Sequence, residues 1–293
     1  MDTIIFPWGP FTISVLSLSF SVAIIISLIM VYIAGRRSNL SVQTVIDFIL
    51  ICLVSGVIGG RLTHVLAVNR SYYLQHLDQI IHLQDGGMSF WGGFILALVA
   101  VMIWSGRRNY ILKPYLDAAA PALALGLSIG RIGYPWQGKI MSAPYPWGII
   151  KDGQVVHPEG VYAIILLMLL YIYLTHRRRQ VHYQGELILI FIAGYGLINL
   201  IVDHFSRLPV VWGWATAGQL VSLAMIILAV TYFIGGSKIY SSSYYFNQRI
   251  YRRPPSRFKL PARILWLAVL TAAQVYSYYL INGIPVGLIR LMI

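Results

Sequence analysis

The sequence predicts an all-α fold, a polytopic bundle of seven to eight transmembrane helices, and three observations support it. Of the 293 residues, 58% are hydrophobic and only 11% are charged, whereas soluble domains carry about 25% charged residues. Apolar runs recur along the chain, with lengths near the roughly 20 residues that a helix needs to cross a bilayer core. Membrane strands would instead alternate apolar and polar residues in short segments. The composition excludes a soluble globular enzyme, a disordered chain and a disulfide scaffold.

Eight runs have the composition of membrane spans. Their approximate limits are 11–34, 45–68, 88–105, 115–133, 160–175, 185–203, 215–235 and 264–281. The fifth run is short, and Gly126 and Gly130 weaken the fourth as a helix, so seven spans is the competing count. We expect a transmembrane domain over residues 1–235. Over residues 236–293 we expect a basic cytoplasmic segment followed by an additional C-terminal transmembrane helix.

The excess of basic residues predicts the orientation in the membrane. The chain has 22 Lys and Arg against 9 Asp and Glu, a formal net charge of +13. Most of these basic residues follow the odd-numbered runs, namely Arg36, Arg37, Arg107, Arg108, Lys113, Arg177, Arg178, Arg179 and the segment 236–262. Because cytoplasmic loops are enriched in Lys and Arg, we expect the N-terminus outside. The segment 236–262 also mixes in aromatic residues, but its place between two spans favours anionic membrane lipids over nucleic acid.

Arg61 is the first candidate functional residue, because charged side chains at membrane depth are expensive and mark functional sites. It follows Gly59 and Gly60 toward the end of the second run. We expect its side chain either to point into the bundle or to snorkel to the interface.

A glycine-rich motif, Asp85-Gly86-Gly87-Met88-Ser89-Phe90-Trp91-Gly92-Gly93, opens the third run. Paired glycines on both sides of an aromatic residue allow a backbone or a ligand to approach closely. Free backbone N–H groups at the start of a helix also suit an anion. Tight helix packing through small residues is the alternative interpretation.

Arg131 is the strongest candidate. It follows the fourth run, in which Gly126 and Gly130 stand four residues apart, and it precedes a Gly/Pro-rich break over 132–138. Non-helical backbone at this depth is tolerated only where it is buried in protein or lines a cavity. A planar guanidinium held there is suited to grip a phosphate. The alternative is an interfacial arginine that anchors the end of the helix.

The remaining candidates are titratable or polar residues near the predicted outer surface. His157, in the loop before the fifth run, could titrate near neutrality and act as a base, with a solvated loop histidine as the alternative. Asp203, with Asn199 one turn earlier, needs a partner for its charge. The alternative to a functional role is that it pairs with another residue or caps a helix for structural reasons. The single cysteine, Cys52, excludes an intramolecular disulfide. The sequence offers no cluster of metal ligands, and we expect no metal or other cofactor.

Seven segments, taken in order, resemble the landmarks of the prolipoprotein diacylglyceryl transferases of bacterial inner membranes. They are GGRLTHVL (59–66), DGGMSFWGG (85–93), LDAAAPALALGLSIGRIGYPWQG (116–138), PWG (146–148), HPEGVY (157–162), YGLINLIVDHFSR (195–207) and GQLVSL (218–223). The resemblance extends from about Phe6 to Phe233, and the segment that follows is additional.

The resemblance implies a bundle of about seven helices in the bacterial cytoplasmic (inner) membrane. It implies binding of phosphatidylglycerol and transfer of its diacylglyceryl group to the lipobox cysteine of a preprolipoprotein, with glycerol phosphate leaving. Arg131 would then grip the phosphate, and Arg61 would line the same cavity. The substrate-binding residues predicted in this way and from the motifs above are Arg61, Gly87, Ser89, Trp91, Gly92, Gly130, Gly133, Gly138, Asn199 and Asp203.

The chain departs from the family pattern at several polar positions. Trp91 stands where histidine is typical, Tyr134 where asparagine is expected, and Asn199 where arginine is usual. In an active transferase His157 or Tyr134 would substitute for missing groups, so the predicted catalytic residues are Arg131, His157 and Tyr134. The alternative is a catalytically diverged relative that binds phospholipid or a membrane partner without transferase activity. A transporter has little support, because paired broken helices in matching halves are not evident.

Overall fold

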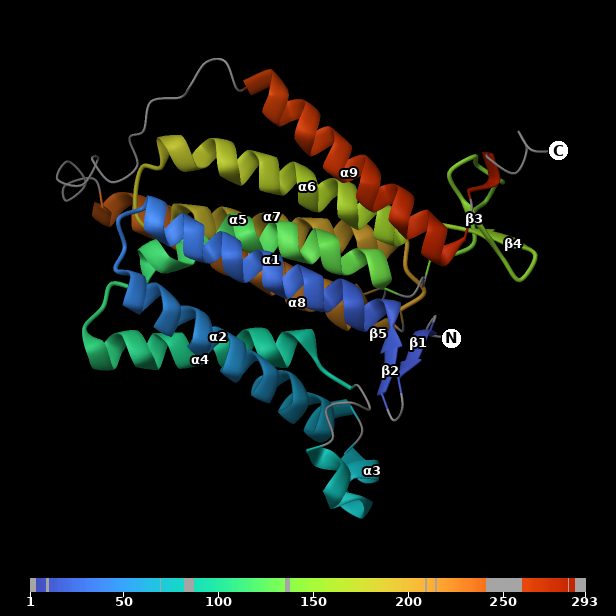
Figure 1. Cartoon of the computed structure of the whole chain (residues 1–293), viewed down its shortest axis with the longest axis horizontal. Helices are drawn as coiled ribbons and strands as arrows, with labels where there is room; N and C mark the ends of the chain where they lie inside the picture. The colour runs from blue at the N-terminus through green and yellow to red at the C-terminus, as the bar shows by residue number, and fades with distance from the viewer. Residues whose placement is uncertain are drawn as a thin grey trace. The chain divides into compact units, whose positions relative to one another are not determined.

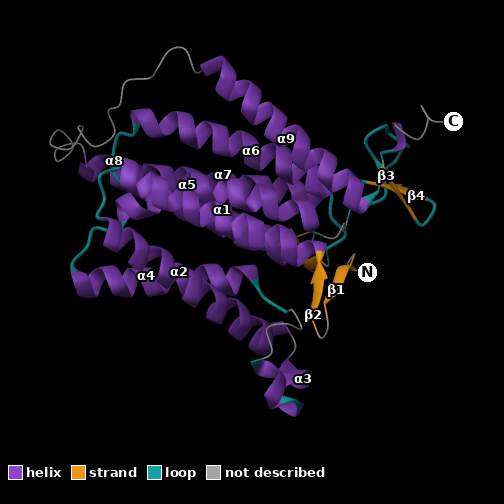
Figure 2. Ribbon diagram, viewed as in Figure 1, coloured by secondary structure: helices purple, strands orange, loops and turns teal. Residues whose placement is uncertain are grey.

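The computed structural model describes residues 4–8, 11–68, 70–81, 87–134, 138–208, 210–213, 215–240, 260–283 and 285–287. Helices make up most of this part of the chain, and its strands form three two-stranded antiparallel sheets (Figures 1 and 2). Each of the eight apolar runs predicted from the sequence coincides with a helix. Three predicted features lie wholly or partly outside the described residues: the Asp85-Gly86 start of the glycine-rich motif, residues 135–137 of the break, and 241–259 of the basic segment.

Seven of the described helices are long and apolar enough to cross a membrane. They are α1 (Val15–Arg37), α2 (Val42–Thr63), α4 (Phe90–Arg108), α5 (Lys113–Gly130), α6 (Glu159–Arg177), α7 (Glu186–His204) and α9 (Leu260–Asn282). In addition, α8 (Ala217–Tyr240) contains the shorter apolar stretch Gly218–Phe233. The prediction of an all-α polytopic bundle with seven to eight spans is confirmed, and the chain is a multi-pass membrane protein.

Short elements connect the long helices. The helical ones are η1 (His64–Val68), α3 (Arg70–Gln75), η2 (Leu77–Ile80), η4 (Arg131–Gly133) and η5 (Arg178–Gln180). The strands are β1 (Ile4–Trp8), β2 (Phe11–Ser14), β3 (Ile149–Lys151), β4 (Gln154–Val156), β5 (Val210–Trp212) and β6 (Ala215–Thr216), and they pair β1-β2, β3-β4 and β5-β6. The β3-β4 hairpin leads, through His157 and Pro158, to the first turn of α6.

The chain forms two compact units, Val31–Ala118 and the remainder, with boundaries inside α1 and α5. In the unit Val31–Ala118, α2 and α4 cross at glycines. A Cβ atom on Gly59 would lie 2.5 Å from the Gly92 carbonyl oxygen, and one on Gly92 would lie 2.6 Å from the Gly59 carbonyl oxygen. Small residues thus let the two backbones touch, as is typical of membrane helix pairs. These units differ from the predicted division near residue 235, which stays a prediction.

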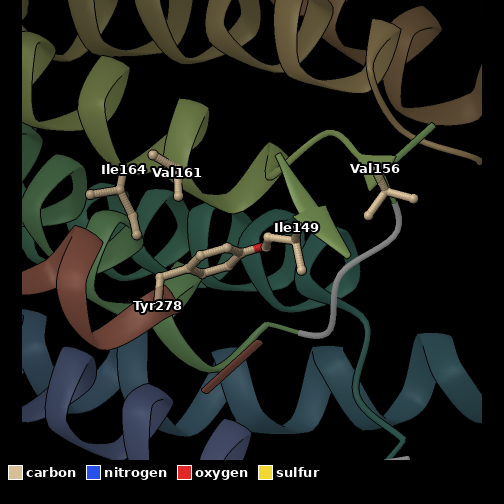
Figure 3. Packing of buried hydrophobic residues seen from close by; sticks show 5 residues of the cluster. All are labelled: Ile149, Val156, Val161, Ile164 and Tyr278. Atoms are coloured by element: carbon tan, nitrogen blue, oxygen red, sulfur yellow. The ribbon is translucent and has the colours of Figure 1, made fainter. Parts of the chain in front are cut away.

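In the larger unit, α6, α7 and α8 pack in sequence and α9 packs on α6 and on η4. Figure 1 shows α9 beside α6. One apolar cluster joins the β3-β4 hairpin to α6 and α9 (Figure 3), and its buried members are Ile149, Val156, Val161, Ile164 and Tyr278. Burial of these side chains holds the β3-β4 hairpin against α6 and α9, which both contact η4.

Candidate functional site

Arg131 opens η4, a short 3-10 turn that continues directly from α5. Its guanidinium lies over the ring of Tyr134, with Cζ 5.1 Å from the ring centroid, which is cation–π geometry. It also lies within electrostatic range of the Tyr195 hydroxyl and the Asp203 carboxylate of α7. The structure therefore brings together three residues predicted from the sequence and adds Tyr195, which was not predicted.

The face of α7 toward Arg131 carries a polar stripe. Tyr195, Asn199 and Asp203 are spaced four residues apart, so they follow one another along one side of the helix. The Asn199 side chain is buried and reaches the Tyr195 hydroxyl, which is also in hydrogen-bonding reach of Arg131. Thr216 Oγ1 donates to Asp203 Oδ2 at 3.4 Å. The four-residue spacing was the signal that could have revealed Tyr195.

The glycines around Arg131 differ in how tightly they are packed. A Cβ on Gly133 would lie 2.6 Å from the Val15 carbonyl oxygen and 2.9 Å from Leu16 Cα, and both are backbone atoms of the first turn of α1. A Cβ on Gly130 would lie 3.6 Å from the Phe20 ring, an ordinary contact. Close backbone packing therefore requires glycine at Gly133 and leaves room for a side chain at Gly130.

The loop that carries Lys139 and His157 is tied to the end of α7 by backbone hydrogen bonds. The Lys139 amide donates to the Phe205 carbonyl at 2.7 Å, and the His157 amide donates to the Lys139 carbonyl at 2.9 Å. Gly138 packs so closely against the His157 backbone that a Cβ atom would overlap the carbonyl oxygen. These contacts fix His157 beside the end of α7. A substrate-binding role for Gly130, Gly133 and Gly138 stays a prediction.

His157 has a defined environment in this loop. Its Nδ1 lies 3.1 Å from Tyr162 Oη, and its ring lies 4.9 Å from the ring of Phe205, centroid to centroid. Partial burial lowers the pKa of His157, and electrostatic repulsion from the His204 and Lys139 side chains lowers this pKa further. The imidazole is therefore neutral at neutral pH, the form that can accept a proton.

Glu159 is a buried acidic residue that the sequence prediction did not select. It is the first residue of α6, only 3% exposed, and it accepts a hydrogen bond from Ser206 Oγ after the end of α7. A carboxylate in the first turn of a helix is favoured by the helix dipole. An acidic residue beginning an apolar run, two positions after His157, was the available signal.

Arg61 lies in the unit Val31–Ala118, and its side chain is buried, with 6% of the residue exposed. Nε donates to the Ile80 carbonyl at 2.9 Å, and the terminal nitrogens donate to the carbonyls of Gln79 at 2.6 Å and Gly87 at 3.1 Å. The guanidinium also lies over the ring of Tyr73, 5.2 Å from its centroid. Arg61 therefore holds the end of η2 and the entry to α4 together.

The other predicted residues of this unit are used largely for local structure. Ser89 is the N-cap of α4 and accepts a hydrogen bond from the Gly92 amide at 3.4 Å. Gly92 is a helix-packing residue, as the alternative interpretation proposed. Gly87 has a φ of +75° and packs against the His64 ring, while Trp91 is half-buried. Substrate contacts of these residues and of Arg61, and a cavity that Arg61 shares with Arg131, stay predictions.

In the part of the chain that the structure describes, no group of three or more His, Cys, Asp or Glu side chains is arranged to hold a metal ion. The chemistry available at the candidate site is that of a guanidinium, a neutral imidazole, carboxylates and tyrosine hydroxyls.

Comparison with known proteins places these residues in context. The family model "Prolipoprotein diacylglyceryl transferase" matches residues 3–235. A phosphatidylglycerol–prolipoprotein diacylglyceryl transferase of Geobacter sulfurreducens is 35% identical over 213 residues, which cover 68% of this chain and 80% of the relative. Proteins of the same name from Dechloromonas aromatica (30% identical, 78% of this chain and 93% of the relative) and Finegoldia magna (29%, 67% and 80%) are also similar.

Proposed function

The chain belongs to the prolipoprotein diacylglyceryl transferase family, as its motifs predicted, and we propose that it transfers the diacylglyceryl group of phosphatidylglycerol to the lipobox cysteine of preprolipoproteins. The observation that supports this reaction best is the position of Arg131. It stands at the break after α5, between the Tyr134 ring and the polar stripe of α7. We place the enzyme in the bacterial cytoplasmic (inner) membrane with its N-terminus outside, as the distribution of basic residues favours.

The reaction is a displacement at carbon. The cysteine thiolate attacks the glycerol carbon that carries the phosphate ester, so a C–S bond forms and the C–O bond to the phosphate breaks. The electron pair of that bond leaves with glycerol phosphate, and the product is a thioether. Negative charge develops on the leaving phosphate, and a guanidinium aimed at it stabilises the transition state more than the ground state.

Arg131 is the group that we assign to the phosphate. Its planar fork can donate two parallel hydrogen bonds to phosphate oxygens. The Tyr134 ring beneath it and the Tyr195 hydroxyl beside it restrict its orientation, and Asp203 supplies a compensating charge. With its rotation limited in this way, the guanidinium loses little entropy when it binds.

His157 is the group that we assign to the thiol proton. Its lowered pKa keeps it neutral, so it can take the proton from the cysteine as the thiolate forms. The Tyr162 hydroxyl at Nδ1 fixes the plane of the imidazole. In the tautomer whose Nδ1–H donates to Tyr162 Oη, Nε2 is the nitrogen without hydrogen and is the one that accepts the thiol proton.

The test uses the purified full chain, phosphatidylglycerol in nanodiscs and a synthetic lipobox peptide, with thioether product detected by mass spectrometry. The expected result is a peptide heavier by one diacylglyceryl group. Nanodiscs of phosphatidylethanolamine and a peptide with serine in place of the cysteine are the controls. Absence of product, together with failure to support cells depleted of their own transferase, would refute the proposal.

A phospholipid-binding relative without turnover is the other outcome of the same experiment. In that case phosphatidylglycerol would still raise the melting temperature of the protein, and Arg131→Ala would abolish this increase, while product would be absent in every sample. No observation on the described residues favours this outcome specifically.

A further inference from the structure

Helix α9 lies outside the family match, which ends at residue 235, yet it is built into the candidate site. It packs on α6 and on η4, the turn that begins with Arg131. Its buried residues are spaced four apart and form one stripe: Gln274, Tyr278 and Asn282. Its other sides expose large side chains such as Trp266, Tyr276 and Leu280. This division is typical of a membrane helix that packs on protein along one stripe and faces lipid elsewhere.

Tyr278 is the central contact of the buried stripe. Its side chain is fully buried, and its ring occupies the space next to Gly160 that any larger residue would need. Figure 3 shows the ring between the β3-β4 hairpin and the first turns of α6, among Ile149, Val156, Val161 and Ile164. His157 lies in the chain between these two elements, and Glu159 is the first residue of α6. The Tyr278 ring therefore supports both ends of the segment that carries them.

Tyr279 leads to His157 by a second route. Its hydroxyl donates to the Trp147 carbonyl at 2.7 Å, and Trp147 Nε1 donates to Tyr162 Oη at 3.1 Å. Tyr162 Oη in turn lies 3.1 Å from His157 Nδ1. The three contacts form a continuous path from α9 to the imidazole, in which each step is a hydrogen bond of ordinary length.

Two further contacts attach this segment on either side of the tyrosines. Ser128, which lies on α5 less than one turn before Arg131, donates from Oγ to Gln274 Oε1 of α9 at 2.6 Å, and both residues are buried. Beyond the end of α9, the Val286 amide donates to the Gly148 carbonyl at 3.0 Å. A buried polar pair such as Ser128 and Gln274 is costly to separate, because each partner would be left unsatisfied.

We propose that Tyr278 and Tyr279 are positioning residues of the transferase site, and that α9 is a fixed part of that site in this chain. The Tyr278 ring and the Tyr279 hydroxyl hold the loop that carries Lys139 and His157, so that the His157 imidazole keeps one orientation. The catalytic consequence rests on the proposed function, whereas the effect on His157 itself does not. Misorientation of a proton-accepting group lowers turnover, because a displaced group rarely reaches the reacting atom.

The experiment measures His157 directly in the full chain. Carbethoxylation by diethyl pyrocarbonate is followed by mass spectrometry, and His182, whose side chain is 69% exposed, is the reference within each sample. In Tyr278→Ala and Tyr279→Phe we expect the rate at His157 relative to His182 to rise about threefold or more, since the loop opens locally. The matched controls are Tyr276→Ala and Tyr276→Phe, because Tyr276 is 64% exposed on the same helix. Both should behave as the unchanged chain.

Two variants separate positioning from a general loss of structure. Tyr278→Phe keeps the ring, which makes the packing contacts with Gly160 and the apolar cluster, and removes only the hydroxyl, so this variant should return close to the unchanged rate. Tyr279→Phe removes a single oxygen, so it tests the positioning of His157 even if Tyr278→Ala does not accumulate. In the transfer assay, kcat of Tyr279→Phe should fall about tenfold with KM for phosphatidylglycerol nearly constant.

The outcomes are distinguishable. Equal carbethoxylation rates in Tyr279→Phe and the Tyr276 controls would overturn the inference, even if the chain is an active transferase. Altered rates in a chain that forms no thioether would uphold the positioning of His157 and refute the proposed function.

Discussion

Two arginines that follow glycines near the ends of membrane helices are used in different ways in this protein. Arg61 donates to three backbone carbonyls, those of Gln79, Ile80 and Gly87, and so holds its own surroundings together. Both guanidinium groups lie over a tyrosine ring, but Arg131 has the polar side chains of α7 beside it in place of backbone carbonyls. The sequence context of the two is nearly the same, yet their hydrogen-bonding partners differ.

This difference indicates which arginine can bind an anion. Three backbone carbonyls already accept hydrogen bonds from the Arg61 guanidinium, so a ligand could bind it only by replacing these contacts. A guanidinium restrained by an aromatic face and a hydroxyl keeps N–H groups that a phosphate can use. We therefore expect Arg131 to affect turnover and Arg61 to affect stability.

The largest expected effect is that of Arg131→Ala. Loss of the phosphate-binding guanidinium should lower kcat/KM for thioether formation at least about 100-fold, the usual cost of removing a transition-state donor. Arg131→Lys keeps the charge without the planar fork, so its kcat/KM should lie between those of Arg131→Ala and the unchanged chain. Arg207→Ala, at an exposed position after the end of α7, is the control. An Arg131→Ala protein within twofold of the unchanged chain would remove the distinction between the two arginines.

The glycines next to Arg131 give the second effect. Gly133→Ala forces a Cβ into the backbone at the start of α1, so η4 must shift and Arg131 with it. We expect turnover to fall about tenfold, in line with the cost of overpacking a tight contact. Gly130→Ala places its Cβ in ordinary contact with Phe20, so its turnover should stay within about twofold of that of the unchanged chain. Equal losses in both variants would show that close packing at Gly133 does not orient Arg131.

Arg61→Met gives the third effect, on stability. Three carbonyls lose a hydrogen bond from the guanidinium, and we expect a cost of about 2 kcal/mol, or about 4–8 °C in melting temperature, with faster proteolysis within residues 70–81. Arg70→Ala, at an exposed position of the same unit, is the control. A loss of turnover as large as that of Arg131→Ala at unchanged melting temperature would instead place Arg61 in contact with substrate.

The smallest effect concerns pH. Lys139 is one of the cations that lower the pKa of His157, so Lys139→Met should raise this pKa. A base works only while neutral, so the acidic limb of the pH–rate profile should move to higher pH. The free energy of unfolding should follow the same rule. A histidine whose pKa is lower in the folded than in the unfolded state contributes stability above the unfolded pKa, and this contribution is lost as the pH falls through the folded pKa. Because the pKa is lowered less in Lys139→Met, this variant should lose less stability on acidification. An unshifted limb, as expected for Lys151→Met, would exclude His157 as the base.

The membrane helices could be predicted because the signal for each is local. A run of apolar residues near 20 in length needs no distant partner to become a helix in a bilayer, since every backbone hydrogen bond is made within it. Arg131, His157 and Asp203 could also be selected, because each is a polar group beside an apolar run or a glycine break. Their common position around one helix end follows from the tertiary structure.

Other features required the tertiary structure. Gly92 suggested either a ligand or a helix contact, and only the crossing of α2 with α4 showed its contact with Gly59. Tyr278 lies more than 100 positions after Gly160 in the chain, and nothing in the local sequence of either residue indicates the other. Tyr195 was one of twenty tyrosines until its stripe on α7 was seen to face Arg131.

The sequence by itself determined that the chain crosses the membrane many times, which family it resembles, and which few charges stand at membrane depth. These properties depend on composition and on short motifs. The tertiary structure decided how the charges are used: one arginine holding carbonyls, another among tyrosines, and a helix beyond the family match supporting His157. Hydrogen bonds and packing join residues that are far apart in sequence, and the geometry of those contacts, rather than residue type, determines which polar group stays available to a substrate.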